Sequence, residues 1–196
     1  MTLEVHPLTP ERWPDFESLF GRSGAYAHCW CTWWRQPGAD FDAGCRNGGA
    51  GNRDVLMRLT DEGRTPGLIG YRDGVPIGWV SVAPRAEFGR VLRSPNLKPE
   101  AGEPKPEANG TWAVVCFWIP RKHRGQGVAT DLLAAAVERA RSSGARRVEA
   151  YPIPTAGKRH DSSGLFTGTL GMFTAAGFSV VRERKASRPV VALELT

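Results

Sequence analysis

The sequence has no run of eighteen apolar residues, so no segment is long enough to cross a bilayer as a helix. The first seven residues lack both a basic start and an apolar stretch, which argues against a secretory signal. We find no internal repeat and no composition change typical of a domain boundary. We therefore expect a single cytoplasmic domain over residues 1–196, with no membrane partner.

Cysteine is scarce, with four residues in a chain of 196, which is too few for a disulfide scaffold. His28-Cys29-x-Cys31 together with Cys45 could be read as zinc ligands, but the paired Cys-x-x-Cys spacing of a metal knuckle is missing. We expect reduced thiols and no metal. Cys116 is interpreted as a core thiol, because nothing near it in sequence would activate it.

Acidic residues are outnumbered by basic ones, 20 to 26, which gives a net charge of +6. An excess of positive charge favours anionic ligands. Nucleic acid is one such ligand, but the chain has neither a basic tail nor a helix-long basic stripe. A polyanionic cofactor fits the charge as well, and we expect no nucleic-acid partner.

Hydrophobic periodicity predicts an α+β chain with a mixed sheet. The predicted strands cover residues 3–8, 67–72, 77–82, 112–119, 147–151, 178–183 and 190–195, and the predicted helices cover 10–20, 26–35, 52–62, 128–142 and 165–176. The Asp73-Gly74 pair is a hairpin signal between the second and third strands. Residues 93–110 are rich in Pro, Glu, Lys and Gly, which predicts either a lid or a linker.

The segment Arg121-Lys122-His123-Arg124-Gly125-Gln126-Gly127-Val128-Ala129 joins the most apolar predicted strand to a long predicted helix. The first amides of a helix have no internal partner and carry partial positive charge. Glycines let the backbone approach a ligand closely, so the segment predicts a pyrophosphate site. A P-loop would need a Gly-Lys-Ser/Thr ending that is absent, and a dinucleotide fingerprint would need glycine where Thr130 stands.

Arg124-x-x-Gly127-x-Ala129 resembles the Arg/Gln-x-x-Gly-x-Gly/Ala signature of the Gcn5-related N-acetyltransferases (GNAT). Met172-Phe173-Thr174-Ala175-Ala176-Gly177-Phe178 resembles the family's late helix, and the similarity runs from Gly67 to the C-terminus. The resemblance implies a GNAT-like fold. Its central mixed, mostly antiparallel sheet is flanked by helices and has a V-shaped split between the fourth and fifth strands.

The resemblance also implies acetyl-CoA as co-substrate and direct attack on its thioester by a neutral amine of a small-molecule acceptor. The strand backbone of Phe117, Trp118 and Ile119 would hold the pantetheine arm. The pyrophosphate would lie against Arg124, Gly125, Gln126, Gly127, Val128, Ala129 and Thr130. The protein would act as a monomer or a homodimer. The aromatic segment 28–35 lies where this family builds its acceptor pocket and would line it; the alternative is an amphipathic helix that packs three tryptophans into the core.

Two positions depart from the family pattern. Phe173 stands where the usual acid is a tyrosine, and residues 112–115 of the fourth strand are apolar where some members carry Glu or His. The candidates for acid and base are Tyr151, His160, Glu149 and Asp161, and each could instead be an ordinary strand or loop residue. Phe173 also favours an alternative function: a GNAT-fold protein that binds CoA or another adenine-containing ligand for regulation or a different transfer.

Overall fold

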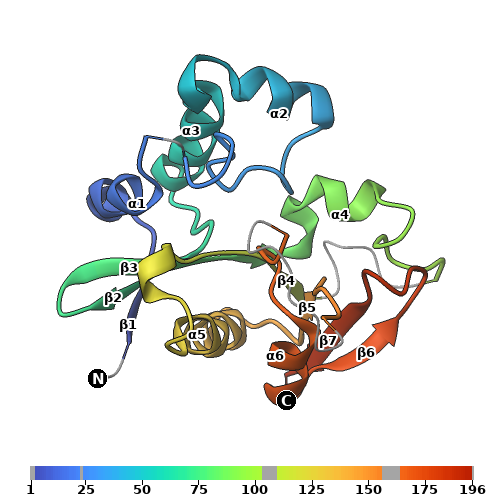
Figure 1. Cartoon of the computed structure of the whole chain (residues 1–196). Helices are drawn as coiled ribbons and strands as arrows, with labels where there is room; N and C mark the ends of the chain where they lie inside the picture. The colour runs from blue at the N-terminus through green and yellow to red at the C-terminus, as the bar shows by residue number, and fades with distance from the viewer. Residues whose placement is uncertain (1–2, 23, 103–109, 156–163, 196) are drawn as a thin grey trace.

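The computed structural model describes residues 3–22, 24–102, 110–155 and 164–195. These residues form a seven-stranded sheet in the order β1-β2-β3-β4-β5-β7-β6 (Figure 1). The strands are β1 (Glu4–Pro7), β2 (Leu68–Arg72), β3 (Val75–Pro84), β4 (Thr111–Trp118), β5 (Arg147–Ala150), β6 (Ser179–Arg182) and β7 (Val190–Glu194). The β4–β5 pair is parallel and the other pairs are antiparallel. The predicted mixed, mostly antiparallel sheet is therefore confirmed.

Helices cover both faces of this sheet. They are η1 (Pro10–Arg12), α1 (Trp13–Phe20), α2 (Gly38–Gly44), α3 (Arg46–Asp61), η2 (Arg85–Glu87), α4 (Gly89–Arg93), η3 (Arg121–His123), α5 (Val128–Ser142) and α6 (Leu170–Ala175). In Figure 1, α1 to α4 lie over one face, and α5 and α6 lie under the other. Within the described residues, no helix is both long and apolar enough to cross a membrane.

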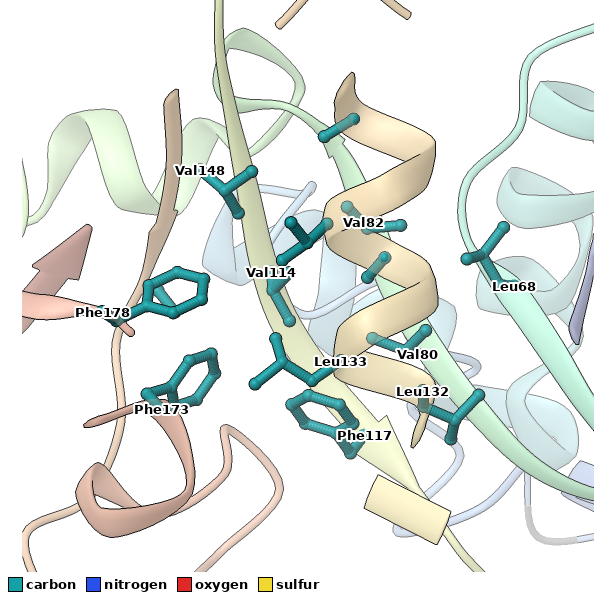
Figure 2. Close-up of a cluster of buried hydrophobic side chains, with 14 of the residues drawn as sticks. Leu68, Val80, Val82, Val114, Phe117, Leu132, Leu133, Val148, Phe173 and Phe178 are labelled. Carbon is teal, nitrogen blue, oxygen red and sulfur yellow. The ribbon is translucent and has the colours of Figure 1, made fainter. Parts of the chain in front are cut away.

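The helix α5 fixes the centre of the sheet through its apolar stripe. Its buried side chains, which pack mainly on β2, β3 and β4 (Figure 2), include Leu132, Leu133, Ala136, Val137 and Ala140. A Cβ on Gly78 would lie 2.9 Å from side-chain atoms of Leu132 and Val128, so glycine lets the helix approach β3. Both ends of α5 match the range predicted from its sequence period. This packing holds the turn before α5 against the end of β4.

The sheet splits at the end of β4. The β4–β5 ladder begins with Thr111 opposite Arg147 and ends with Val114 opposite Ala150, so the second half of β4 has no β5 partner. On the other edge Ser81 pairs with Cys116 and Val82 with Val114, which leaves Val115 as the extra residue of a β-bulge. The bulge brings Cys116 to the same face of the sheet as Val115. The predicted split between the fourth and fifth strands is present here.

The prediction of a helix over residues 26–35 is wrong. Ala27, His28, Trp30 and Cys31 have φ between 43° and 60°, and the segment forms a series of turns. Left-handed residues break the i to i−4 ladder, so tertiary contacts override the helical spacing of the tryptophans. The ring of Trp30 packs at 6.1 Å from that of Phe16, inside the core under α1.

Other boundaries also differ from the prediction. The helix α2 was not predicted, and α3 begins before Asn52 with a break at Asn47, Gly48 and Gly49, which have φ from 51° to 83°. The last helix, α6, begins at Leu170 rather than 165, because a turn and a backbone bridge between Ile153 and Thr169 precede it. Within 93–110, the described residues 94–102 contain neither helix nor strand, and residues 103–109 lie outside the described part.

Candidate functional site

A cavity of about 1580 Å³ opens along the unpaired half of β4. Its walls come from six parts of the described chain: the end of β4, the turn before α5, residues 153–154 with 165–172, residues 25–41 with Phe20, α4 with residues 94–97, and the turn before β7. The lining residues used below are Cys29, Cys31, Trp33, Trp34, Phe41, Arg90, Arg93, Cys116, Phe117, Trp118, Ile119, Arg124, Ala129, Phe166, Thr169, Met172, Lys185 and Arg188. The cavity therefore connects the predicted cofactor turn with the aromatic segment.

The turn before α5 presents unpaired backbone donors. The backbone N–H groups of residues 125–129 donate no hydrogen bond to any residue that the structure describes. Gly125 and Gly127 have φ of 71° and 80°, values that favour glycine. A Cβ built on either would meet no atom within 4 Å, so the space in front of both is open. These amides, the open space and the α5 N-terminus suit a diphosphate.

Basic side chains surround the same turn. Arg121, Lys122 and Arg124 are exposed, and Arg72 donates from Nη1 to Oε1 of Gln126 at 2.6 Å. The pKa of His123 lies below its usual value, first because of partial burial and then because of the charges of Lys122 and Arg72. The turn is therefore electropositive, as an anion site requires.

The backbone expected to hold the pantetheine arm is partly engaged. The Phe117 N–H donates to the Phe166 carbonyl at 2.6 Å, across the split. Arg124 Nε donates to the Ile119 carbonyl at 2.8 Å, and Trp118 Nε1 donates to the Leu19 carbonyl at 3.1 Å. The segment that holds Phe166 thus lies where the strand β5 has ended.

Glu149 and Tyr151 lie side by side, as their alternation on one strand face predicted, but both are fully buried. The Tyr151 hydroxyl donates to Glu149 Oε2 at 3.4 Å, and Arg85 Nη1 donates to Glu149 Oε1 at 3.0 Å. Burial, and then the Glu149 charge, raise the pKa of Tyr151 well above its usual value. Neither belongs to the described cavity lining, so this geometry favours a structural role, and their catalytic role stays a prediction.

No other acid–base candidate is found in the described cavity lining. His160 and Asp161 lie outside the described residues. Phe173, at the family's tyrosine position, is fully buried, with its ring 5.1 Å from that of Phe178 and 6.3 Å from that of Phe117. Among the described lining residues there is no Asp, Glu or His. A search of the same described residues finds no cluster of three or more His, Cys, Asp or Glu that could hold a metal ion.

Three thiols line the cavity between the aromatic segment and β4. Burial first, and then electrostatic coupling to the Cys31 sulfur, raise the pKa of Cys29 to about 12. Burial acts to raise the pKa of Cys31, but hydrogen bonds from Cys116 and Trp79 hold it below its usual value. The hydrogen bond to Cys31, and then burial, raise the pKa of Cys116. Cys116 thus faces the cavity and is not solely a core thiol.

Part of the aromatic segment 28–35 lines the cavity, through Cys29, Cys31, Trp33 and Trp34, whereas Trp30 packs in the core. That this cavity is the acceptor pocket stays a prediction. Trp33 is 37% exposed and Trp34 is 8% exposed. Sequence reasoning missed Arg90 and Arg188, which also line the cavity. Arg90 lies on the short helix α4 and Arg188 in a turn before β7, and no motif in the sequence marks either position. Only the folded chain brings them to one cavity.

Comparisons with known proteins identify the family of the chain. A model of the acetyltransferase (GNAT) family matches residues 6–160. A search of curated proteins finds no match.

Similar folds occur among solved structures. A PaiA N-acetyltransferase from Thermoplasma acidophilum, crystallised in complex with coenzyme A, is 13% identical, with all of both chains covered and a TM-score of 0.55. An N-acetyltransferase from Staphylococcus aureus Mu50 is also 13% identical over 100% of both chains, with a TM-score of 0.56. An acetyltransferase from Thermus thermophilus is 19% identical over 100% of this chain and 98% of its own, with a TM-score of 0.51. The family model covers most of the chain, and the chain belongs to the GNAT family of acetyltransferases.

Proposed function

We propose that the protein is an acyl-CoA-dependent N-acyltransferase that moves an acetyl group from acetyl-CoA to the amine of a small-molecule acceptor. The observation that carries the proposal is the row of amides at residues 125–129, which donate to none of the described residues and reach the cavity at Ala129. The diphosphate of the co-substrate would lie against these amides and against Arg124, Gln126 and Thr130. The backbone of Phe117, Trp118 and Ile119 would hold the pantetheine arm.

Acetyl-CoA supplies the activated thioester and the thiolate leaving group. The protein's part is to position the acceptor and to supply it as a neutral amine. The lining cations Arg90, Arg93 and Arg188 disfavour an added positive charge, and the apolar walls disfavour any charge, so both lower the pKa of a bound ammonium. The Phe117 N–H becomes free to bind the arm or the reacting carbonyl oxygen when Phe166 leaves it.

The proton transfers have four candidate groups from the sequence. Tyr151 and Glu149 would need a rearrangement or a water chain to reach the cavity, because both are fully buried. His160 and Asp161 stay predictions for the loop before Gly164. Water in the cavity is a further route for the proton of the amine, since the described lining has no carboxylate or imidazole.

The test is product formation. The protein would be incubated with acetyl-CoA and a panel of primary amines, and N-acetylated products would be identified by mass spectrometry. We expect acetylation of at least one small amine, with release of CoA. Failure of every amine, together with no measurable binding of acetyl-CoA, would exclude the proposal.

Phe173 favours a second candidate function. A phenylalanine cannot protonate the leaving thiolate, and its burial leaves no access from the cavity. A protein with this cradle but without turnover would bind CoA, or another adenine-containing ligand, for regulation or for a different transfer. Tight binding of acetyl-CoA without acetylation of any amine would favour it. Mass spectrometry of ligands that co-purify with the protein would identify a different donor.

A further inference from the structure

The side of the cavity away from the turn before α5 carries positive charge that no acidic residue of the described structure pairs with. Arg90, Arg93, Lys185 and Arg188 line it, and the described lining has no carboxylate. None of the four forms an ion pair with a described residue. Elsewhere the chain pairs its buried arginines with acids, as Arg85 does with Glu149 at 3.0 Å. Arg93 and Lys185 are exposed to solvent, whereas Arg90 and Arg188 are half-buried. A cation without a counter-charge is costly where it is withdrawn from water, so Arg90 and Arg188 point to an anionic ligand.

Arg90 is held by aromatic rings and not by hydrogen bonds. Its guanidinium carbon lies 3.6 Å from the ring centre of Trp33 and 5.7 Å from that of Phe41. The Nε and Nη2 atoms are shielded from water and donate to none of the described residues. Burial lowers the pKa of Arg90, and the charge of Asp42 opposes that shift from a distance, since the two side chains form no ion pair within the described structure. A ligand oxygen would supply the acceptor that these donors lack.

Arg188 brings a second guanidinium to the same cavity, from the turn before β7. Its Nη1 donates to the Tyr151 carbonyl at 3.1 Å and to Thr167 Oγ1 at 2.8 Å, so the side chain is fixed by neutral partners. Burial lowers the pKa of Arg188 below its usual value. A guanidinium has five donors in a planar fork, which leaves donors for a carboxylate after these two bonds.

On the basis of the proposed function, we infer that the acceptor is an amino acid with an apolar side chain, whose carboxylate is bound by Arg90 and Arg188. The carboxylate offsets the cationic wall, and the aromatic residues Trp33 and Phe41 contact the apolar side chain. The same cations disfavour acceptors that carry only positive charge, such as polyamines. The α-amine is thereby placed in the cavity in a field that favours its neutral form.

Matched acceptors test this inference. Phenylalanine would be compared with phenethylamine and phenylalaninamide, which keep the amine and the ring but lack the carboxylate, and the readout would be kcat/KM for N-acetylation. We expect phenylalanine, or another apolar amino acid, to exceed its decarboxylated partner by at least about tenfold, the usual effect of a hydrogen-bonded charge. Phosphoethanolamine belongs in the panel, and a preference for it over every amino acid would overturn the carboxylate assignment.

Two variants locate the effect. Arg90→Gln keeps most of the side-chain length and removes the charge, so the ratio of acid to amine should fall about tenfold. Arg141→Gln is the matched control, since Arg141 is exposed and pairs with Glu138 on α5 at 2.7 Å, outside the cavity lining. It should leave the ratio unchanged. A ratio that Arg90→Gln does not change would contradict the inference.

Failure of this inference and failure of the proposed function give different results. If acetyl-CoA binds and phenethylamine reacts as well as phenylalanine, the acyltransferase proposal stands and the amino-acid inference is wrong. If no amine is acetylated, isothermal titration of the CoA-loaded protein with phenylalanine and phenylalaninamide decides the inference by itself. Binding of the acid alone supports it, and equal or absent binding of both overturns it.

Discussion

The backbone N–H of Phe117 donates to the carbonyl of Phe166 at 2.6 Å, across the gap where β4 continues and β5 has ended. The proposed function assigns the backbone of 117–119 to the pantetheine arm, so the two partners compete for one donor. Binding of acetyl-CoA should therefore release Phe166. By hydrogen–deuterium exchange, peptides covering 164–169 should exchange faster with acetyl-CoA bound, while peptides covering 124–130 are protected. Protection of both regions would show that Phe166 keeps its contact.

Asn52 holds in place the segment of residues 28–36 that lines the cavity. Its Nδ2 donates to the His28 carbonyl at 3.0 Å, and its Oδ1 accepts from Gln36 Nε2 at 2.7 Å, in a fully buried position. Asn52→Ala should lower the free energy of unfolding by about 2 kcal/mol, since buried polar groups lose their partners. Urea unfolding measures this. Thr60→Ala is the control on the same helix and should cost less, because the Thr60 hydroxyl makes a single hydrogen bond within the described structure, to the Leu56 carbonyl at 3.1 Å.

The variant Tyr151→Phe distinguishes a structural role of the Tyr151 hydroxyl from a catalytic one. The ring is buried against Trp34, and the hydroxyl donates to Glu149 at 3.4 Å. If the role is structural, kcat should stay within about threefold and the free energy of unfolding should fall by about 1 kcal/mol. A loss of kcat of about a hundredfold or more, with unchanged stability, would instead support Tyr151 as the acid.

Glu149→Gln should be much more damaging to stability. The carboxylate is fully buried and faces both Arg85, at 3.0 Å, and Arg147, at 3.4 Å. Breaking a buried ion pair from one side costs about 3–5 kcal/mol. Thermal unfolding followed by circular dichroism should show a clear fall in Tm. An unchanged Tm would mean that the buried charge does not stabilise the fold.

The Cys29 thiol predicts a loss of stability at alkaline pH. Burial raises the pKa of this thiol to about 12 from a usual 9.0, so the unfolded chain releases the proton first as pH rises. The stabilising effect is complete below pH 9 and is lost as pH rises towards 12. Between about pH 9 and 10 the free energy of unfolding should fall by about 1 kcal/mol from this group. Cys29→Ser should remove that part of the fall, as measured by urea unfolding; the same fall in both proteins would contradict it.

The sequence predicts well those elements whose local pattern and tertiary role agree. The bounds of the helix α5 and the strand β4 were predicted to within about one residue. An apolar stripe at helical spacing and a continuous apolar run are each compatible with few other secondary structures. The turn at Gly125 and Gly127 was predicted from its glycines and its place before a helix. Local propensity and fold point the same way at each of these positions.

The cavity wall that contains Trp33, Arg90 and Arg188 could not be predicted from the sequence, because tertiary contacts decide which residues meet there. The tryptophans at 30, 33 and 34 have helical spacing, but left-handed residues such as His28 and Cys31 turn them in different directions. Arg90 and Arg188 are 98 positions apart (188 − 90), and no local pattern relates them to a shared cavity. Burial of Glu149 and Tyr151 depends on Arg85 from another strand end, which spacing along β5 cannot reveal.

The account depends most on the cradle before α5, and binding of acetyl-CoA to the Gly127→Asp variant tests it most directly. Gly127 has φ of 80° and faces open space, so an aspartate there adds a carboxylate beside the unpaired amides. Gly63→Asp is the matched control, with φ of 75°, equally open space and a position outside the cavity.

Isothermal titration should show that acetyl-CoA binds the wild-type protein and Gly63→Asp alike, and that Gly127→Asp weakens the affinity at least about tenfold through charge repulsion and backbone strain. Equal affinity in all three proteins, or no binding to the wild type, would contradict the assignment of this turn as the diphosphate site.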